Sequence, residues 1–124
     1  MSVRVLIVDD LAPFRGAARL IIEATPGFEV AGEVGSGEES LETVRDLKPD
    51  LVLMDVNLPG IDGVEAGRRI VADEPSTVVV LVSTRDGEDV GSIVADSGAA
   101  AYLAKARLTS EALTEVWLAA TTGS

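Results

Sequence analysis

The stretch LVLMDVNLPGIDG, residues 51–63, decides the fold that we expect for this chain. It begins with four apolar residues, as does a strand that is buried on both faces of a parallel sheet. Asp55 follows at once, and Asn57-Leu58-Pro59-Gly60 then bends the chain away in a turn. Since a carboxylate at the edge of an apolar core loses solvation, Asp55 needs a partner or a chemical task.

The composition predicts a single cytoplasmic domain. The chain has 124 residues, of which 47% are apolar and 25% charged, and this suits one compact domain. No apolar run approaches the roughly 20 residues of a membrane span, and the N-terminal segment turns acidic too early for a signal peptide. We therefore expect no membrane partner and a cytoplasmic location.

The residue types that are missing exclude several kinds of chemistry. Without Cys there are no disulfides and no thiolate catalysis, and without His there is no Ser-His nucleophile pair and no phosphohistidine. The net charge of −11 argues against direct binding of nucleic acid by this domain. A carboxylate-rich surface makes a hard cation the more natural ligand.

Five apolar runs, each bounded by turn residues and followed by a helical pattern, divide the chain. Strands that alternate with helices at this spacing predict an α/β fold, in which helices cover both faces of a parallel sheet. The predicted strands are Val3–Val8, Phe28–Val34, Leu51–Met54, Val78–Val82 and Ala99–Ala104.

Helix boundaries follow from proline, glycine and capping residues. Pro13 suits the first turn of a helix that stops at Pro26-Gly27. Ser36 and Glu39 have the spacing of a capping box, and the helix that they open ends before Pro49. The other predicted helices cover residues 63–73, residues 86–97 and the segment after a cap at Thr109 or Ser110.

The fourth of these helices is the weakest by propensity. Gly87 and Gly91 each lower helix propensity by about 1 kcal/mol relative to Ala. The apolar positions expected to face the sheet are Phe14, Ala17, Ala18, Ile21 and Ile22 in the first helix, Leu41, Val44 and Leu47 in the second, Val64, Ile70 and Val71 in the third, and Leu113, Val116, Trp117 and Ala120 in the fifth.

Polar groups follow four of the five predicted strands. In a doubly wound sheet the carboxyl ends of the strands meet at one edge, where ligands bind. Each group taken alone has an ordinary explanation as a turn, a cap or a surface charge, but their coincidence at four strand ends favours a site. The groups are the Asp9-Asp10 pair after the first strand, Asp55 after the third, Ser83-Thr84 after the fourth and Lys105 after the fifth.

Three neighbouring carboxylates disfavour one another's ionisation and therefore need a counterion. Asp9, Asp10 and Asp55, with carbonyl and water oxygens, would suit Mg²⁺ and leave positions open for phosphate oxygens. Lys105 would be a second cation, paired with Asp55 or with a phosphoryl oxygen, and Ser83 can donate a hydrogen bond to that oxygen. Asp55 can itself be the nucleophile toward a phosphoryl group, so that no His is required.

At this point the sequence resembles the receiver domains of bacterial two-component response regulators. The motifs that carry the resemblance are VLIVDD at residues 5–10, LVLMDVNLPGIDG at 51–63, VVVLVST at 78–84 and GAAAYLAK at 98–105. The resemblance implies a flavodoxin-like doubly wound sheet of five parallel strands in the order 2-1-3-4-5, with five helices. It covers essentially the whole chain, with a receiver domain over residues 1–122 and a tail at 123–124.

The resemblance also implies roles for individual residues. Asp55 would be the phosphoryl acceptor and Asp10 the direct Mg²⁺ ligand, with Asp9 acting largely through water. The backbone carbonyl of Asn57 would be a further metal ligand, and Lys105 matches the lysine of the family motif. Such a domain is no enzyme toward other substrates and catalyses only its own phosphorylation and dephosphorylation.

Three residues match the switch of the family. Ser83 is the switch hydroxyl, Thr84 follows it, and Tyr102 is the aromatic that moves between outward and inward positions. A sensor histidine kinase would donate the phosphoryl group, and activation would remodel the face of the fourth helix, fifth strand and fifth helix.

The output of this switch is left open by the sequence. The patterns most resemble receivers attached to LuxR-type helix-turn-helix domains. The expected output is therefore transcription through a C-terminal DNA-binding domain that this chain lacks, or docking to a partner protein. A phosphorylation-dependent homodimer is a further expected state.

Two positions depart from the family pattern. Ala106 follows Lys105 where many receivers have Pro, so the cis peptide often found there is not expected. Thr84 is bulkier than the usual residue at its position, which leads to the hypothesis that the phosphorylated form is long-lived because the attacking water is hindered.

Three alternatives accompany this interpretation. A haloacid-dehalogenase-like phosphatase would use Asp55 as its nucleophile but needs an acid where Asn57 stands. A flavodoxin-like FMN domain would need a phosphate loop after the first strand, where Asp9-Asp10 would repel phosphate. A degenerate receiver would bind partners without phosphorylation.

Overall fold

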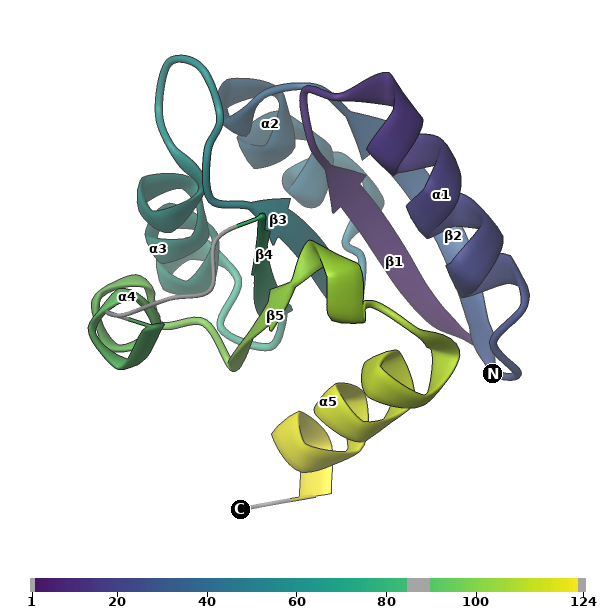
Figure 1. The fold of residues 1–124 in the computed structure, drawn as a ribbon. Coiled ribbons are helices and arrows are strands. Elements are labelled where there is room, and N and C mark those ends of the chain that lie inside the picture. The colour runs from purple at the N-terminus through teal and green to yellow at the C-terminus, as the bar shows by residue number, and fades with distance from the viewer. Residues whose placement is uncertain (1, 85–89, 123–124) are drawn as a thin grey trace.

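Five parallel strands in the order β2-β1-β3-β4-β5 form the single sheet at the centre of the fold (Figure 1). A computed structural model describes residues 2–84 and 90–122 of the chain. Over these residues the elements are β1 Val3–Val8, α1 Ala12–Glu23, β2 Phe28–Val34, α2 Gly37–Leu47, β3 Leu51–Asp55, α3 Gly63–Asp73, β4 Val78–Ser83, α4 Val90–Ser97, β5 Ala101–Ala104, the 3₁₀ turn η1 Lys105–Arg107 and α5 Ser110–Thr122.

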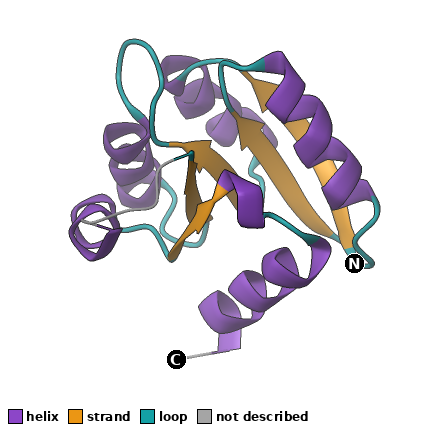
Figure 2. Cartoon of the chain, in the orientation of Figure 1, coloured by secondary structure: helices purple, strands orange, loops and turns teal. Residues whose placement is uncertain are grey.

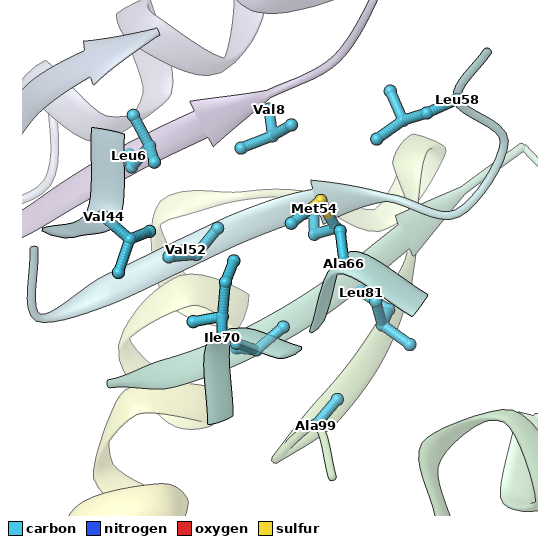
Figure 3. Packing of buried hydrophobic residues seen from close by; sticks show 11 residues of the cluster. Leu6, Val8, Val44, Val52, Met54, Leu58, Ala66, Ile70, Leu81 and Ala99 are labelled. Atoms are coloured by element: carbon cyan, nitrogen blue, oxygen red, sulfur yellow. The ribbon is translucent and has the colours of Figure 1, made fainter. Parts of the chain in front are cut away.

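Helices cover both faces of the sheet, as the alternating pattern predicts (Figure 2). One buried cluster joins the sheet to α2 and α3 and includes Val44 and Ile70; it is seen from close by in Figure 3. The other joins the opposite face to α1 and α5 and includes Ile22 and Leu113. The strand order and the two covered faces confirm the predicted flavodoxin-like doubly wound fold.

The central strands agree closely with the apolar runs. β1 and β2 have the predicted bounds, while β3 and β4 each extend one residue further, through Asp55 and Ser83. Every residue of β3 is buried, because the strand lies between β1 and β4 and under helices on both faces. The carboxylate of Asp55 is therefore held on the sheet itself and not on a loop.

The predicted start of the last strand at Ala99 is wrong by two residues. Gly98, with φ +72°, ends the preceding helix, and the Ser97 hydroxyl accepts a hydrogen bond from the Ala99 amide at 3.1 Å. The Ala100 amide then reaches the Val79 carbonyl at 2.8 Å, so β5 begins only at Ala101. A left-handed glycine turn occupies residues that composition alone assigns to the strand.

Most predicted helix boundaries are confirmed. The hydroxyl of Ser36 accepts the Glu39 amide at 3.1 Å, and Thr109 rather than Ser110 caps α5, accepting the Ala112 amide at 3.0 Å. Residues 86–89 of the predicted fourth helix, with Gly87, and the tail at 123–124 lie outside the described residues.

Two predicted core positions are wrong. Ala17 of α1 is exposed because it lies at the margin of the apolar stripe of its helix. Ala120 of α5 is exposed because it lies near the end of its helix, where all of residues 118–122 are exposed. Trp117 and Val116 are half-buried against the sheet as expected. No helix among the described residues is long and apolar enough to cross a bilayer.

Candidate functional site

The carboxyl ends of β1, β3, β4 and β5 bring the predicted polar groups to one edge of the sheet. Asp9 and Asp10 follow β1, Asp55 ends β3, and Ser83 ends β4. Lys105 begins the 3₁₀ turn directly after β5. Parallel strands share one direction, so four segments far apart in sequence meet at this edge.

Asp9 is fully buried at the end of β1. Its Oδ1 accepts a hydrogen bond from the Leu11 amide at 2.8 Å, and its own amide bonds the Val34 carbonyl of β2 at 3.1 Å. Its Oδ2 lies 2.6 Å from Lys105 Nζ, a contact with the distance of an ion pair but without hydrogen-bond alignment. This buried oxygen thus has a charge partner but no hydrogen-bond donor among the described residues, and it can accept a further ligand.

Asp55 is nearly as deeply placed, with 3% of the residue exposed. Its Oδ1 accepts the Asn57 amide at 3.2 Å, and its Oδ2 lies 3.5 Å from Lys105 Nζ. Burial raises the pKa of Asp55 above its ordinary value, and the Asp9 charge adds to this, against the opposing effects of the Asn57 amide and Lys105. The surroundings of Asp55 therefore disfavour the charged form of its carboxylate.

Lys105 is the cation at the centre of the cluster, with 10% of its side chain exposed. Its ammonium contacts Asp9 more closely than Asp55, at 2.6 Å against 3.5 Å. It also lies 4.4 Å from the centroid of the Phe14 ring, within the range of a cation–π interaction. The Lys105–Ala106 peptide is trans.

Three carboxylates converge where a cation would bind. Oxygens of Asp9, Asp10 and Asp55 lie within 4.8 Å of one another, and Asp10 is the exposed member. Hard oxygen donors, an open outer side and the Asp9 oxygen without a donor fit a divalent cation such as Mg²⁺, which keeps several waters when it binds. The predicted acidic residues are thus brought together in an arrangement that could hold the ion.

The remaining predicted residues lie around this cluster. Asn57 is exposed, and its side-chain amide donates to the Ser83 hydroxyl at 3.5 Å. Ser83 is buried at the end of β4 and Thr84 beyond it is exposed. Tyr102 is half-buried on β5, against the cluster that includes Leu81.

The loop after Asp55 is fixed from two sides. The Gly63 amide bonds the Val56 carbonyl at 3.0 Å, and the Glu38 carboxylate on α2 accepts the Ile61 amide at 3.1 Å. This backbone hydrogen bond lowers the pKa of Glu38. The turn that leads away from Asp55 therefore holds a definite path.

Sequence reasoning missed three residues that touch the site. Phe14 was assigned to the core alone, and Arg15 and Glu33 were not assigned at all. Arg15 Nη1 donates to the Asp9 carbonyl at 2.6 Å, and its Nε pairs with Glu33 at 3.2 Å. A basic residue one turn into the helix after the Asp pair was the available signal, but its partner on β2 is visible only in the fold.

Comparisons with known proteins agree with this geometry. A family model described as the response regulator receiver domain matches residues 5–116. The response regulator GacA of Pseudomonas viridiflava is 41% identical over 103 residues, which are 83% of this chain and 48% of that protein. The transcriptional regulatory protein DegU of Brevibacillus brevis is 36% identical over 104 residues, 84% of this chain and 44% of that protein. The chain thus spans about half the length of these curated relatives.

Solved structures show the same architecture. A two-component response regulator of the LuxR family from Aurantimonas sp. SI85-9A1 superimposes with a TM-score of 0.87 at 28% identity, over 99% of this chain and 87% of that one. The response regulator domain of Thermotoga maritima CheB superimposes with a TM-score of 0.83 at 31% identity, over 97% of each chain.

Proposed function

Because this chain belongs to the response regulator receiver domain family of two-component signalling, we propose that it accepts a phosphoryl group on Asp55 from a sensor histidine kinase. The observation that supports this most is the placement of Asp55. Its carboxylate ends a fully buried strand, one oxygen is held by the Asn57 amide, and the other faces Lys105 and two more carboxylates.

Asp55 is the nucleophile in this proposal. A carboxylate oxygen attacks phosphorus, the new P–O bond forms, and the bond from phosphorus to the donor breaks with its electron pair leaving on the donor. Phosphoryl transfer requires mainly alignment and neutralisation of charge. β3 supplies the alignment, since the backbone of Asp55 is paired with Val82 of β4 in the sheet.

Lys105 and Ser83 act on the phosphoryl oxygens. The Lys105 ammonium lies 3.5 Å from Asp55 and can pair with an oxygen of the incoming group, while Asp9 keeps the ammonium in place at 2.6 Å. Ser83, at the end of the neighbouring strand, can donate a hydrogen bond to the same group.

We assign the metal site to the carboxylates of Asp9, Asp10 and Asp55 together with the backbone carbonyl of Asn57. Bound Mg²⁺ would neutralise the negative charge that the carboxylates and the phosphoryl oxygens bring together. The Asp9 oxygen that has no hydrogen-bond donor in the described part of the chain supports this assignment, as does the close approach of the three carboxylates.

The proposed output passes from the phosphorylated edge of the sheet to a neighbouring face of the domain. Ser83, Thr84 and Tyr102 would transmit phosphorylation to the face of α4, β5 and α5, within a receiver domain of residues 1–122 in the cytoplasm. This face would control transcription through a C-terminal DNA-binding domain, or a partner protein, with a phosphorylation-dependent homodimer as a further form. The similarity to DegU, a transcriptional regulatory protein, supports the first output. The domain itself would catalyse only its own phosphorylation and dephosphorylation.

Intact mass spectrometry after incubation with acetyl phosphate tests the proposal. We expect the mass to rise by one phosphoryl group in the presence of Mg²⁺, and not with EDTA or in Asp55→Asn. Asp46→Asn is the matched control, because Asp46 is an exposed residue of α2, outside the acidic cluster. The fluorescence of Trp117, the only tryptophan of the chain, is followed in parallel for a response to Mg²⁺.

The outcomes separate the receiver interpretations. A gain that survives in Asp55→Asn would show that another residue is the acceptor. No gain in any variant, with Trp117 fluorescence still responding to Mg²⁺, would identify a degenerate receiver that binds metal without accepting phosphate.

A further inference from the structure

One arginine outside the acidic cluster contacts its backbone. Arg15 belongs to α1, the helix that lies beside β1 and β2 in Figure 1. Its Nη1 donates to the carbonyl of Asp9 at 2.6 Å, and its Nε bonds Glu33 Oε1 on β2 at 3.2 Å. Both side chains are about three-quarters buried, with 24% and 25% exposed. The guanidinium thus bridges two strand ends through hydrogen bonds with charged character.

The surrounding residues keep the guanidinium in this place. Glu33 is also paired with Arg19, one turn further along α1. Gly35 lies beside this hydrogen bond, because a Cβ atom built on it would lie 3.7 Å from Arg15 Nη1 and 4.0 Å from the Asp9 carbonyl oxygen. Arg15 therefore has a defined orientation relative to Asp9.

The carbonyl that Arg15 holds belongs to the peptide between Asp9 and Asp10. The Asp9 amide is held by Val34 at 3.1 Å, and the Asp9 carboxylate holds the Leu11 amide at 2.8 Å. Arg15 supplies the third fixed point of this short turn. The peptide plane from which Asp10 leaves the strand is thereby fixed, although the Asp10 side chain itself is exposed.

We propose that Arg15, anchored by Glu33, is a positioning residue that orients Asp10 for cation binding. The inference rests on the proposed metal site and adds to it a residue that would not itself coordinate the cation. Groups that orient ligands without touching the metal typically change metal affinity by about 10-fold to 100-fold.

Charge and positioning predict opposite results for loss of Arg15. A guanidinium beside a cation site repels the cation, so its charge alone would make a neutral variant bind the metal more tightly. If Arg15 orients Asp10, the neutral variant binds more weakly. The sign of the change in affinity therefore separates the two roles.

The experiment is a titration of the metal-free protein with Mn²⁺, in which electron paramagnetic resonance measures the free ion. We expect Arg15→Gln to weaken binding roughly 10-fold and Arg15→Lys, which keeps the charge and one donor, to weaken it less. Arg45→Gln is the matched control, because Arg45 pairs with Asp73 on an exposed surface of α2 and α3. A second readout is the amide resonance of Asp10, which shares the peptide with the held carbonyl and should shift in Arg15→Gln before any metal is added.

Unchanged or tighter Mn²⁺ binding by folded Arg15→Gln overturns the inference. If thermal unfolding shows that this variant is not folded, Glu33→Asp is tested in its place. This variant keeps the negative charge but moves the carboxylate away from Arg15 by one methylene group. Weaker binding there supports the inference, and unchanged binding overturns it. If the unmodified chain does not bind Mn²⁺, both the proposed metal site and the inference are wrong. If the unmodified chain binds Mn²⁺ and the variants bind it equally well, only the inference is wrong.

Discussion

Asp55→Asn should make this protein more stable at neutral pH, although it removes the proposed phosphoryl acceptor. Burial and the Asp9 charge raise the pKa of Asp55, so the folded state holds its proton more tightly than the unfolded state does. At neutral pH the carboxylate is charged in the unfolded chain, and folding must place that charge in an unfavourable environment. Asn is the neutral group of nearly the same shape and avoids this cost.

The size of the effect follows from the contacts of Asp55. At an effective dielectric constant of about 20, the attraction to Lys105 over 3.5 Å amounts to about 5 kcal/mol, and the repulsion from Asp9 within 4.8 Å to at least about 3.5 kcal/mol. The two charges thus largely cancel, while desolvation of a buried carboxylate costs several kcal/mol. Asn cannot bond both the Asn57 amide and Lys105 with its single oxygen, which reduces the gain. We expect a net stabilisation of about 1–2 kcal/mol.

Urea unfolding in the presence of EDTA at several pH values measures this gain. The pKa of Asp55 is raised in the folded state, so the cost of its charge is present above the folded pKa and disappears below the unfolded value of about 3.9. The difference between Asp55→Asn and the unmodified protein should therefore shrink as the pH falls. A variant that is less stable at neutral pH, or a gain that persists at acid pH, would refute the reasoning.

Three further predictions concern the same edge of the sheet. Mg²⁺ at ten times its dissociation constant should raise the free energy of unfolding by about 1.4 kcal/mol, and Asp10→Asn should lose this response in thermal melts. Lys105→Met removes the charge partner of fully buried Asp9 and should lower the free energy of unfolding, measured in urea without metal, by about 3–5 kcal/mol. Addition of Mg²⁺ should restore part of this stability. No recovery would contradict the idea that Lys105 and Mg²⁺ both neutralise the same carboxylates. A Cβ at Gly63 would lie 1.9 Å from the Asp55 carbonyl oxygen, so Gly63→Ala should destabilise the protein by at least about 1–3 kcal/mol. Gly16 is an exposed position of α1 with open space around it, so Gly16→Ala should stabilise the protein by about 0.5–1 kcal/mol in the same unfolding assay.

The parts of the fold that could be predicted from sequence are those set by local pattern. Apolar runs identify the buried strands because a strand covered on both faces has no polar position. Prolines and capping residues identify the helix ends, as at Ser36 and Thr109. The start of β5 could not be predicted this way, since Ala99 is as apolar as the strand that follows, and only the left-handed turn at Gly98 excludes it.

The residues of the site were predictable for a topological reason, but the distances between their side chains were not. Parallel strands place their carboxyl ends together, so Asp9, Asp55 and Lys105 had to meet once the fold was assigned. Which carboxylate the ammonium approaches more closely depends on side-chain packing, and the structure gives Asp9 at 2.6 Å. The place of Arg15 one turn into α1 can be read from the sequence, but its pairing with Glu33 depends on the packing of α1 against β2 and is visible only in the fold.

The three carboxylates at this edge of the sheet differ in how they can respond to the excess of negative charge. Asp9 is fully buried at the end of β1, and Asp55 lies in the ladder between β3 and β4, so neither can move away to relieve their repulsion. Asp10 is exposed beyond the end of β1, and its carboxylate is the one that solvent already stabilises. A cation that enters the site therefore relieves mainly the buried pair, while its affinity depends on how well Asp10 is placed to complete the coordination. The stabilisation by Mg²⁺ and the loss of Mn²⁺ affinity in Arg15→Gln thus measure two separable properties. The first is the repulsion between the buried carboxylates of Asp9 and Asp55, and the second is the orientation of Asp10.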